Sequence, residues 1–376
     1  MDRRNLLSAT VSGGIAWATG AQATVGRANP RGALLPLKVR LGHEIASGHR
    51  LNDTNAAYLA RFGVEGVGCE PQIKEPGRLF NTVDELTQTR ELAEKHGLRL
   101  DLISSVLLNS THVDREPHPA IMLGQSPERD RDIEAFQVLI KNCAAAGIPM
   151  LKYNMSILGV VRSGIVPGRG DSVYLRWNYD AAEQAGEPPP TRAGIVNADA
   201  FWERIDYFLS RVVPVATEYK VKIACHPQDP GMPQPQGWQR VDRVLGTVDG
   251  LKKFIALHES PYHGLNFCQG TVSEDLEDPN IQIGEVIRYF GSRRKIFNVH
   301  FRNIRGHRND FAEVFPDEGS VDFVEALKVY REVGYDGLLM PDHAPQVPDN
   351  PAAQEENFAF AFGHIRGLIQ AEQHIT

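Results

Sequence analysis

The feature that most constrains the fold is an alternation of short apolar runs with longer amphipathic stretches. The stretches 85–97 and 134–147 carry apolar residues at helical spacing and stop at a glycine, as many helices do. The stretch 321–337 repeats this pattern. The apolar runs are each short enough for one strand, and eight are found: 37–42, 64–70, 98–105, 149–155, 221–226, 264–268, 295–301 and 337–342. Alternating strands and helices are typical of parallel β/α units.

Eight such units in a chain of 376 residues predict a single (β/α)8 TIM barrel with long βα loops. The two long loops are expected at 156–200 and 227–248, and loops of this length in a compact domain are usually functional. A doubly wound open sheet is the alternative. It is disfavoured because no Gly-x-Gly-x-x-Gly motif follows the first run.

The first 30 residues are expected to stand apart from the barrel. Arg3 and Arg4 precede an uncharged stretch rich in small residues, which ends in Ala-Gln-Ala at 21–23. This is the layout of a secretory signal, and the arginine pair resembles a twin-arginine signal. We therefore predict a signal peptide and linker at 1–30, a barrel catalytic domain at 31–376, and a periplasmic or exported location. The apolar part is too polar for a membrane-spanning helix.

Charge and composition narrow the class of partner. The formal net charge is −7 and no basic stripe is present, which argues against nucleic acid and against an anionic membrane surface. The expected partner is a small-molecule carbohydrate or sugar acid, without stable membrane insertion. Formation of a homo-oligomer stays open. None of the four cysteines has Cys-x-x-Cys spacing: Cys69, Cys143, Cys225 and Cys268.

Residues of the types that bind metals end the last four apolar runs. They are His226, Cys268, His300 and Asp342. Because the carboxyl ends of barrel strands converge on one mouth, we expect these side chains to meet there. Two imidazoles, a thiolate and a carboxylate form a suitable ligand set for a divalent transition metal. Each residue alone has a simpler explanation, namely a buried thiol, a structural histidine or a helix cap.

Several segments around these residues resemble the mannonate dehydratase family. They are HPQDPGMPQPQGWQRV, GLNFCQG, VHFRNIRG and MPDHAPQ, in this order, with ERDRDIEAFQVLIKNCAAAGIPMLKYNM upstream. The resemblance spans about residues 40–370. It implies a xylose-isomerase-like TIM barrel and a divalent metal, most often Mn²⁺, held by the four residues above. It also implies a lyase that dehydrates D-mannonate to 2-keto-3-deoxy-D-gluconate. Fe²⁺, Co²⁺ and Zn²⁺ also suit these ligands.

Three residues near the predicted metal site are candidates for catalysis. His343 follows Asp342 directly and is the first acid/base candidate, and the family pattern points to the same histidine. Arg302 follows His300 closely and could hold an anionic substrate. Tyr153 is expected near the mouth, although a barrel-lining aromatic is an equally simple reading.

Four further residues are candidates for substrate binding. Asn154 ends the fourth run, and Asn303 follows Arg302. Arg162 lies in the long loop, where it could meet an anionic substrate or be a solvated charge. Asp229 could support a ligating histidine or be a turn residue.

The chain departs from the family pattern at some positions. Gln228 stands where the family usually has Asp, and Ala359 falls where the family carries a catalytic tyrosine. Two alternatives therefore remain. One is a metal-dependent isomerase, epimerase or eliminating enzyme that acts on a keto-sugar or glycoside. The other is an exported sugar-binding barrel without catalysis.

Overall fold

The computed structural model describes residues 35–46, 48–232, 235, 237–350 and 352–374. The predicted signal peptide at 1–30 lies outside the described residues.

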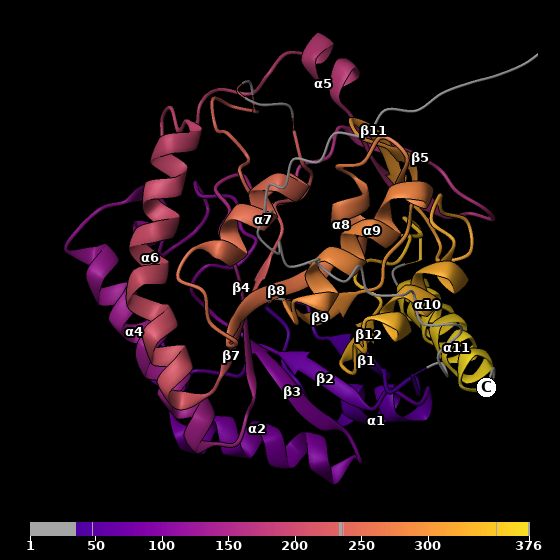
Figure 1. The fold of residues 1–376 in the computed structure, drawn as a ribbon, viewed down its shortest axis with the longest axis horizontal. Coiled ribbons are helices and arrows are strands. Elements are labelled where there is room, and N and C mark those ends of the chain that lie inside the picture. The colour runs from indigo at the N-terminus through magenta and orange to yellow at the C-terminus, as the bar shows by residue number, and fades with distance from the viewer. Residues whose placement is uncertain (1–34, 47, 233–234, 236, 351, 375–376) are drawn as a thin grey trace, which may run out of the picture. The chain divides into compact units, whose positions relative to one another are not determined.

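Eight parallel strands close into a barrel in the order β1-β12-β9-β8-β7-β4-β3-β2 (Figure 1). Each predicted apolar run overlaps one of these strands, so the predicted fold class is confirmed. The strands are β1 (Arg40–Glu44), β2 (Gly66–Cys69), β3 (Arg99–Ser104), β4 (Met150–Asn154), β7 (Lys222–His226), β8 (His263–Cys268), β9 (Ile296–His300) and β12 (Leu338–Met340).

Helices surround the barrel (Figure 1). The predicted helix at 85–97 corresponds to α2, which begins just after Thr82 because Thr82 and Glu85 cap each other's backbone N–H groups. Among the described residues, no helix is long and apolar enough to cross a membrane. The helices are α1 (Asp53–Arg61), α2 (Val83–Lys95), α3 (Ala120–Leu123), α4 (Glu128–Ala145), α5 (Tyr179–Ala185), α6 (Ala198–Tyr219), α7 (Val248–Ala256), α8 (Gln269–Ser273), α9 (Pro279–Ser292), α10 (Phe323–Glu332) and α11 (Ala353–His374).

The barrel interior is layered from apolar to polar. Its apolar layer is drawn from five strands and comprises Leu102, Met150, Ala224, Phe297, Leu338 and Met340. Next to this layer, Asn298 donates a hydrogen bond of 2.7 Å to Asn266. Two residues further along the same strands come His300 and Cys268. Side chains two residues apart lie on the same face of a strand, so His300 and Cys268 also face the interior. The interior is therefore polar at the carboxyl end of the barrel.

Two insertions between barrel strands form a second sheet. Strands β5 (Gly164–Pro167) and β6 (Val173–Asn178) lie between β4 and β7, whereas β10 (Ile304–His307) and β11 (Asp310–Glu313) lie between β9 and β12. They form an antiparallel sheet in the order β10-β11-β6-β5. The long loop expected at 156–200 is the first of these insertions, and it contains β5, β6 and α5. These strands are only four to six residues long, and the sequence analysis did not recognise them as strands.

Candidate metal and substrate site

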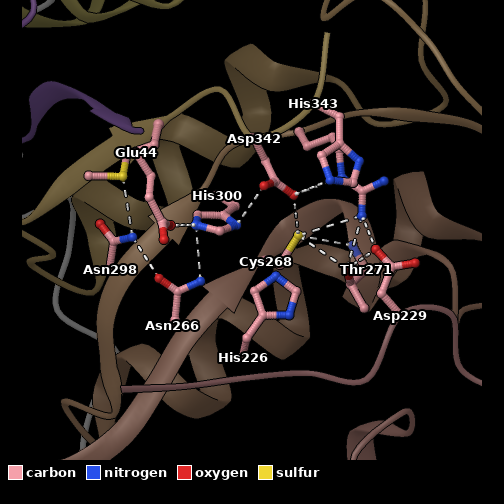
Figure 2. A network of polar contacts seen from close by, with 12 residues as sticks. Glu44, His226, Asp229, Asn266, Cys268, Thr271, Asn298, His300, Asp342 and His343 are labelled. Atoms are coloured by element: carbon pink, nitrogen blue, oxygen red, sulfur yellow. Dashed lines mark hydrogen bonds and ion pairs between the residues drawn. The ribbon is translucent and has the colours of Figure 1, made fainter. Parts of the chain in front are cut away.

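The four predicted metal ligands lie together at the carboxyl end of the barrel (Figure 2). His226, Cys268 and His300 are the last residues of β7, β8 and β9, and Asp342 follows β12 by two residues. One ligand atom from each residue lies within 4.8 Å of the others. These strands are neighbours in the barrel, in the order β12-β9-β8-β7. The register explains the convergence, because Cys268 pairs with His300 and Met340 also pairs with His300.

Each histidine has a fixed orientation that leaves one ring nitrogen for a metal. In His226, Nδ1 lies 2.6 Å from the Pro227 carbonyl oxygen, so Nδ1 carries the proton and Nε2 is free. In His300 the roles are reversed, since Nε2 lies 3.1 Å from Glu44 Oε2. His300 Nδ1 is buried and faces the other ligands, with Asp342 Oδ1 3.2 Å away. A metal ion would satisfy this nitrogen, so the histidines fit a metal site.

The other two ligands are anionic. Burial opposes ionisation of Cys268, but the Arg302 guanidinium lowers the pKa of the thiol well below its usual value. The pKa of Asp342 is also held well below its usual range, because His300 and His343 outweigh the effect of burial. Asp342, Cys268 and Glu44 in turn outweigh burial and raise the pKa of His300 well above its usual value, so a dication would take the place of that proton. A thiolate and a carboxylate beside two imidazoles then form a ligand set that suits a dication.

His343, the predicted acid/base residue, is held by a carboxylate from the second sheet. Its Nδ1 lies 2.6 Å from Oε2 of Glu313, the last residue of β11. Burial favours the neutral ring, but Asp342 and Glu313 outweigh burial and raise the pKa of His343 to about 9. The pair resembles the histidine–carboxylate pairs that fix a tautomer in acid/base catalysis.

A second cluster of charges lies beside the metal ligands and is largely buried. Arg302 Nη2 lies 2.9 Å from both Asp229 Oδ2 and Glu274 Oε1, and its Nη1 lies 3.0 Å from Glu313 Oε1. Arg162 pairs with Asp229 at 2.5 Å and also with Glu313. The three carboxylates are close enough together to hold a metal ion. However, the two guanidinium groups already supply the positive charge there.

A narrow cavity of about 60 Å³ opens onto the metal ligands. Asn154 and Asp229, predicted to bind substrate, are among its lining residues, as is His343. Arg162 and Arg302 are not among the lining residues found in the described part of the chain. A wider groove of about 850 Å³ lies between α7 and α9. None of the four metal ligands lines that groove, so we place the site at the narrow cavity.

The structure does not bring Tyr153 or Asn303 into the site. The Tyr153 ring packs against Phe136 of α4 and Phe208 of α6, at centroid distances of 5.6 and 5.4 Å. It points outward because its strand neighbours Lys152 and Asn154 face the cavity. The Asn303 side chain is hydrogen-bonded to the surrounding backbone.

The Asn303 amide is held on both sides by the backbone. Its Nδ2 donates to the carbonyl groups of Pro316 and Val321 at 3.1 and 2.9 Å. Its Oδ1 accepts from the N–H groups of Ile304 and Val321. These contacts fix the segment after β11, and they leave the side chain no polar group for a substrate.

Three residues of the site were missed by sequence reasoning: Glu44, Lys152 and Glu313. Glu44 and Lys152 are charged residues within barrel strands, where burial without a partner is costly, and this was an available signal. The predicted first strand ended at residue 42 and so excluded Glu44. Glu313 belongs to a strand that was not predicted, so its proximity to His343 could not be anticipated.

Comparisons with known proteins agree with this geometry. The family model described as D-mannonate dehydratase (UxuA) matches residues 48–186 and 192–376. A mannonate dehydratase of Thermotoga petrophila is 30% identical over 322 aligned residues, with 75% of this chain and 82% of that protein covered. Mannonate dehydratase 1 of Halalkalibacterium halodurans is 30% identical over 319 residues, with coverage of 76% and 83%.

Solved structures share the fold. The mannonate dehydratase of Streptococcus suis serotype 2 superposes with a TM-score of 0.73 at 21% identity, and covers 89% of this chain and 94% of that one. A 3-keto-D-glucoside 4-epimerase of E. coli superposes with a TM-score of 0.52 at 12% identity, with coverage of 86% and 99%. Since the family model matches most of the barrel and both relatives described above are 30% identical to it, this chain belongs to the D-mannonate dehydratase family.

Proposed function

We propose that this chain is a metal-dependent hydro-lyase that converts D-mannonate to 2-keto-3-deoxy-D-gluconate. The observation that carries the proposal is the convergence of His226, Cys268, His300 and Asp342 beside the His343–Glu313 pair. Family membership supports a hydro-lyase with a sugar acid as substrate.

The reaction requires a base, an acid and stabilisation of negative charge. The C2–H and C3–O bonds of the sugar acid break, one water molecule leaves, and the resulting enol becomes the 2-keto acid. A divalent metal ion held by the four ligands supplies positive charge where negative charge develops on the reacting acid. The protein supplies the groups that move protons.

His343 is the residue best placed to move a proton. It lines the cavity, and Glu313 occupies its Nδ1. Nε2 is therefore the atom that can exchange a proton with a bound substrate. The position of the family's tyrosine is Ala359, on α11, and its methyl group cannot transfer a proton.

We propose Mn²⁺ as the metal, on the basis of the family resemblance. Elemental analysis of the purified chain and of Cys268→Ser tests the ligand set. We expect about one equivalent of metal in the parent, and loss of most of it in the variant, because a hydroxyl is a much weaker ligand than a thiolate. Cys143→Ser is the matched control, since Cys143 is a buried thiol of α4 outside the site. Equal metal content in all three proteins would refute the assignment.

The activity is tested with the Mn²⁺-loaded full chain and D-mannonate. We expect a product with the mass of the substrate less one water and with a 2-keto group. A screen of neutral keto-sugars and glycosides on the same protein tests the isomerase and epimerase alternative. Turnover of those compounds alone would overturn the lyase proposal. Binding of sugar acids without turnover of any compound would instead support the sugar-binding barrel.

We also propose that the chain is exported, on the basis of the twin-arginine-like segment at its start. Fractionation of cells that express the chain with its native start, and with Arg3 and Arg4 both changed to Lys, is the test. We expect periplasmic protein for the parent and retention in the cytoplasm for the variant. The same distribution of both proteins would count against this route.

A further inference from the structure

The positive charges that sequence analysis assigned to the substrate are used by the protein itself. Arg162 and Arg302 pair with Asp229, Glu274 and Glu313, as described above. Among the described residues that line the cavity, Lys152 is the only lysine or arginine. A sugar acid carries a permanent negative charge, so the residue that recognises its carboxylate should be sought there first.

Lys152 is held in place by a buried carboxylate. It lies in the middle of β4, and its Nζ is 2.8 Å from each carboxylate oxygen of Glu44, the last residue of β1. The Lys152 side chain is 14% exposed, so it reaches the cavity with little freedom to move. An ammonium group has three N–H donors, and Glu44 engages two of them. The third remains available to a ligand in the cavity.

Glu44 does not cancel the charge of Lys152 alone, because it serves three donors. Its carboxylate also accepts a hydrogen bond of 2.6 Å from Ser104 and lies 3.1 Å from His300 Nε2. The single negative charge of Glu44 is therefore shared between Lys152 and the metal-binding histidine. Glu44 is not among the described residues that line the cavity, so it supports Lys152 from behind.

We infer that Lys152 binds the carboxylate of the sugar acid and that Glu44 is the positioning residue for both Lys152 and His300. The inference rests on the proposed function, since it takes a sugar acid as the ligand. It assigns recognition of the acid group to β4, supported by β1 through Glu44. One carboxylate, Glu44, then aligns the substrate anchor and a metal ligand together.

A double-mutant cycle tests the inference on the metal-loaded full chain. The variants are Lys152→Met, Glu44→Gln and the double variant, with Lys152→Arg as the variant that keeps the charge. The readouts are calorimetric binding of D-gluconate and of the uncharged alditol sorbitol, metal content, and KM for D-mannonate. In Lys152→Met we expect D-gluconate affinity to fall roughly tenfold to a hundredfold, as for loss of one hydrogen bond to a charged group. Sorbitol affinity should change by less than about threefold.

The double variant separates substrate binding from charge balance. It removes both charges, so a role limited to neutralising Glu44 predicts that D-gluconate affinity returns to the parent value. Our inference predicts that D-gluconate affinity stays low in the double variant even with Mn²⁺ in excess, because the carboxylate anchor is missing. Metal affinity should fall in both variants that lack Glu44, because Glu44 also positions His300. Recovery of affinity, or equal weakening of D-gluconate and sorbitol, would overturn it.

The outcome for Lys152 is distinguishable from the outcome for the proposed function. If the parent binds D-gluconate through Lys152 but does not dehydrate D-mannonate, the inference stands and the proposed reaction fails. If the parent dehydrates D-mannonate and Lys152→Met keeps both KM and D-gluconate affinity, the proposed reaction stands and the inference about Lys152 fails. If Lys152→Met does not fold, the binding of D-gluconate and of sorbitol is compared between Lys152→Arg, which keeps the charge, and the charge-balanced double variant.

Discussion

At the scale of single residues, hydrogen bonds within the protein engage one ring nitrogen of each histidine in the site and leave the other nitrogen available. The Pro227 carbonyl group holds His226 at Nδ1, whereas Glu44 holds His300 at Nε2, so the two rings present different nitrogens to the metal. Glu313 selects the free nitrogen of His343 in the same way. Glu44 and Glu313 are not among the described residues that line the cavity, yet they determine which ring atoms can bind the metal or exchange a proton.

This dependence makes Glu313 a positioning residue whose role can be tested. We expect Glu313→Gln to lower kcat by at least about tenfold and to keep the metal, because the amide interacts weakly with a protonated ring. His343→Gln should lose roughly a hundredfold or more. Glu313→Gln should add little further loss in the His343→Gln background, as measured by steady-state kinetics.

Tyr153→Phe is the matched control for these kinetic measurements. The ring packs between α4 and α6, and the phenol lies away from the cavity, so kcat should stay within about twofold of the parent. A large loss of kcat in Tyr153→Phe, or additive losses in the Glu313 and His343 double variant, would contradict the assigned roles.

The same residues show how far the sequence could predict the site. The four metal ligands were recognisable because each ends an apolar run, and parallel strands bring such positions together. Tyr153 was misassigned because strand ends were read without their alternation, although Lys152 and Asn154 share one face and Tyr153 occupies the other. Glu313 could not be predicted, because its approach to His343 depends on the pairing of two insertions that are far apart in the chain.

At the scale of elements, the second sheet delivers Glu313 to the site, and its geometry depends on one glycine. Gly306 of β10 has φ +118, and a Cβ there would lie 2.2 Å from the Asp310 carbonyl oxygen in the paired strand. An alanine cannot adopt this backbone conformation without strain. The hairpin of β10 and β11 would therefore shift, and Glu313 would move with it.

We predict that Gly306→Ala lowers kcat/KM on the order of a hundredfold while metal content stays near the parent value. The loss arises because His343 is no longer held in register, whereas the barrel ligands are untouched. Gly363→Ala in α11 is the control, because a Cβ there meets nothing within 4 Å. This variant should keep its activity, and its stability should rise by about 0.5–1 kcal/mol. Loss of metal in Gly306→Ala would show that the sheet supports the barrel instead.

At the scale of the whole molecule, stability depends on groups that lie far from the site. His263 at the start of β8 is buried, and its Nε2 donates to the Phe254 carbonyl group at 3.0 Å. Burial lowers the pKa of His263 from 6.5 to about 4. Between these values the unfolded chain binds a proton that the folded chain does not bind. Folded-state stability from this group is therefore complete above pH 6.5 and is lost as the pH falls to about 4.

The size of this effect is about 3 kcal/mol in the free energy of unfolding. Denaturant unfolding of the parent and of His263→Phe between pH 7 and pH 4 measures it. The difference between the two proteins isolates His263 from other titrating groups, and the parent should lose stability more steeply than the variant. Parallel curves for the two proteins would refute the assignment. His307→Phe is the control, since His307 is exposed.

The barrel closes between its first and last strands, and His300 lies beside that seam. Strands β1 and β12 pair through only two register positions, Arg40 with Leu338 and Leu41 with Leu339. Beyond them, His300 lies between Glu44, which ends β1, and Asp342, which follows β12. The last ligand joins the other three when β12, the last barrel strand, pairs with β9, and Glu44 reaches His300 when β1 pairs with β12. Metal uptake would then report on the docking of the last barrel strand, and through His300 and Glu44 a bound ion would also favour the closed seam between β1 and β12.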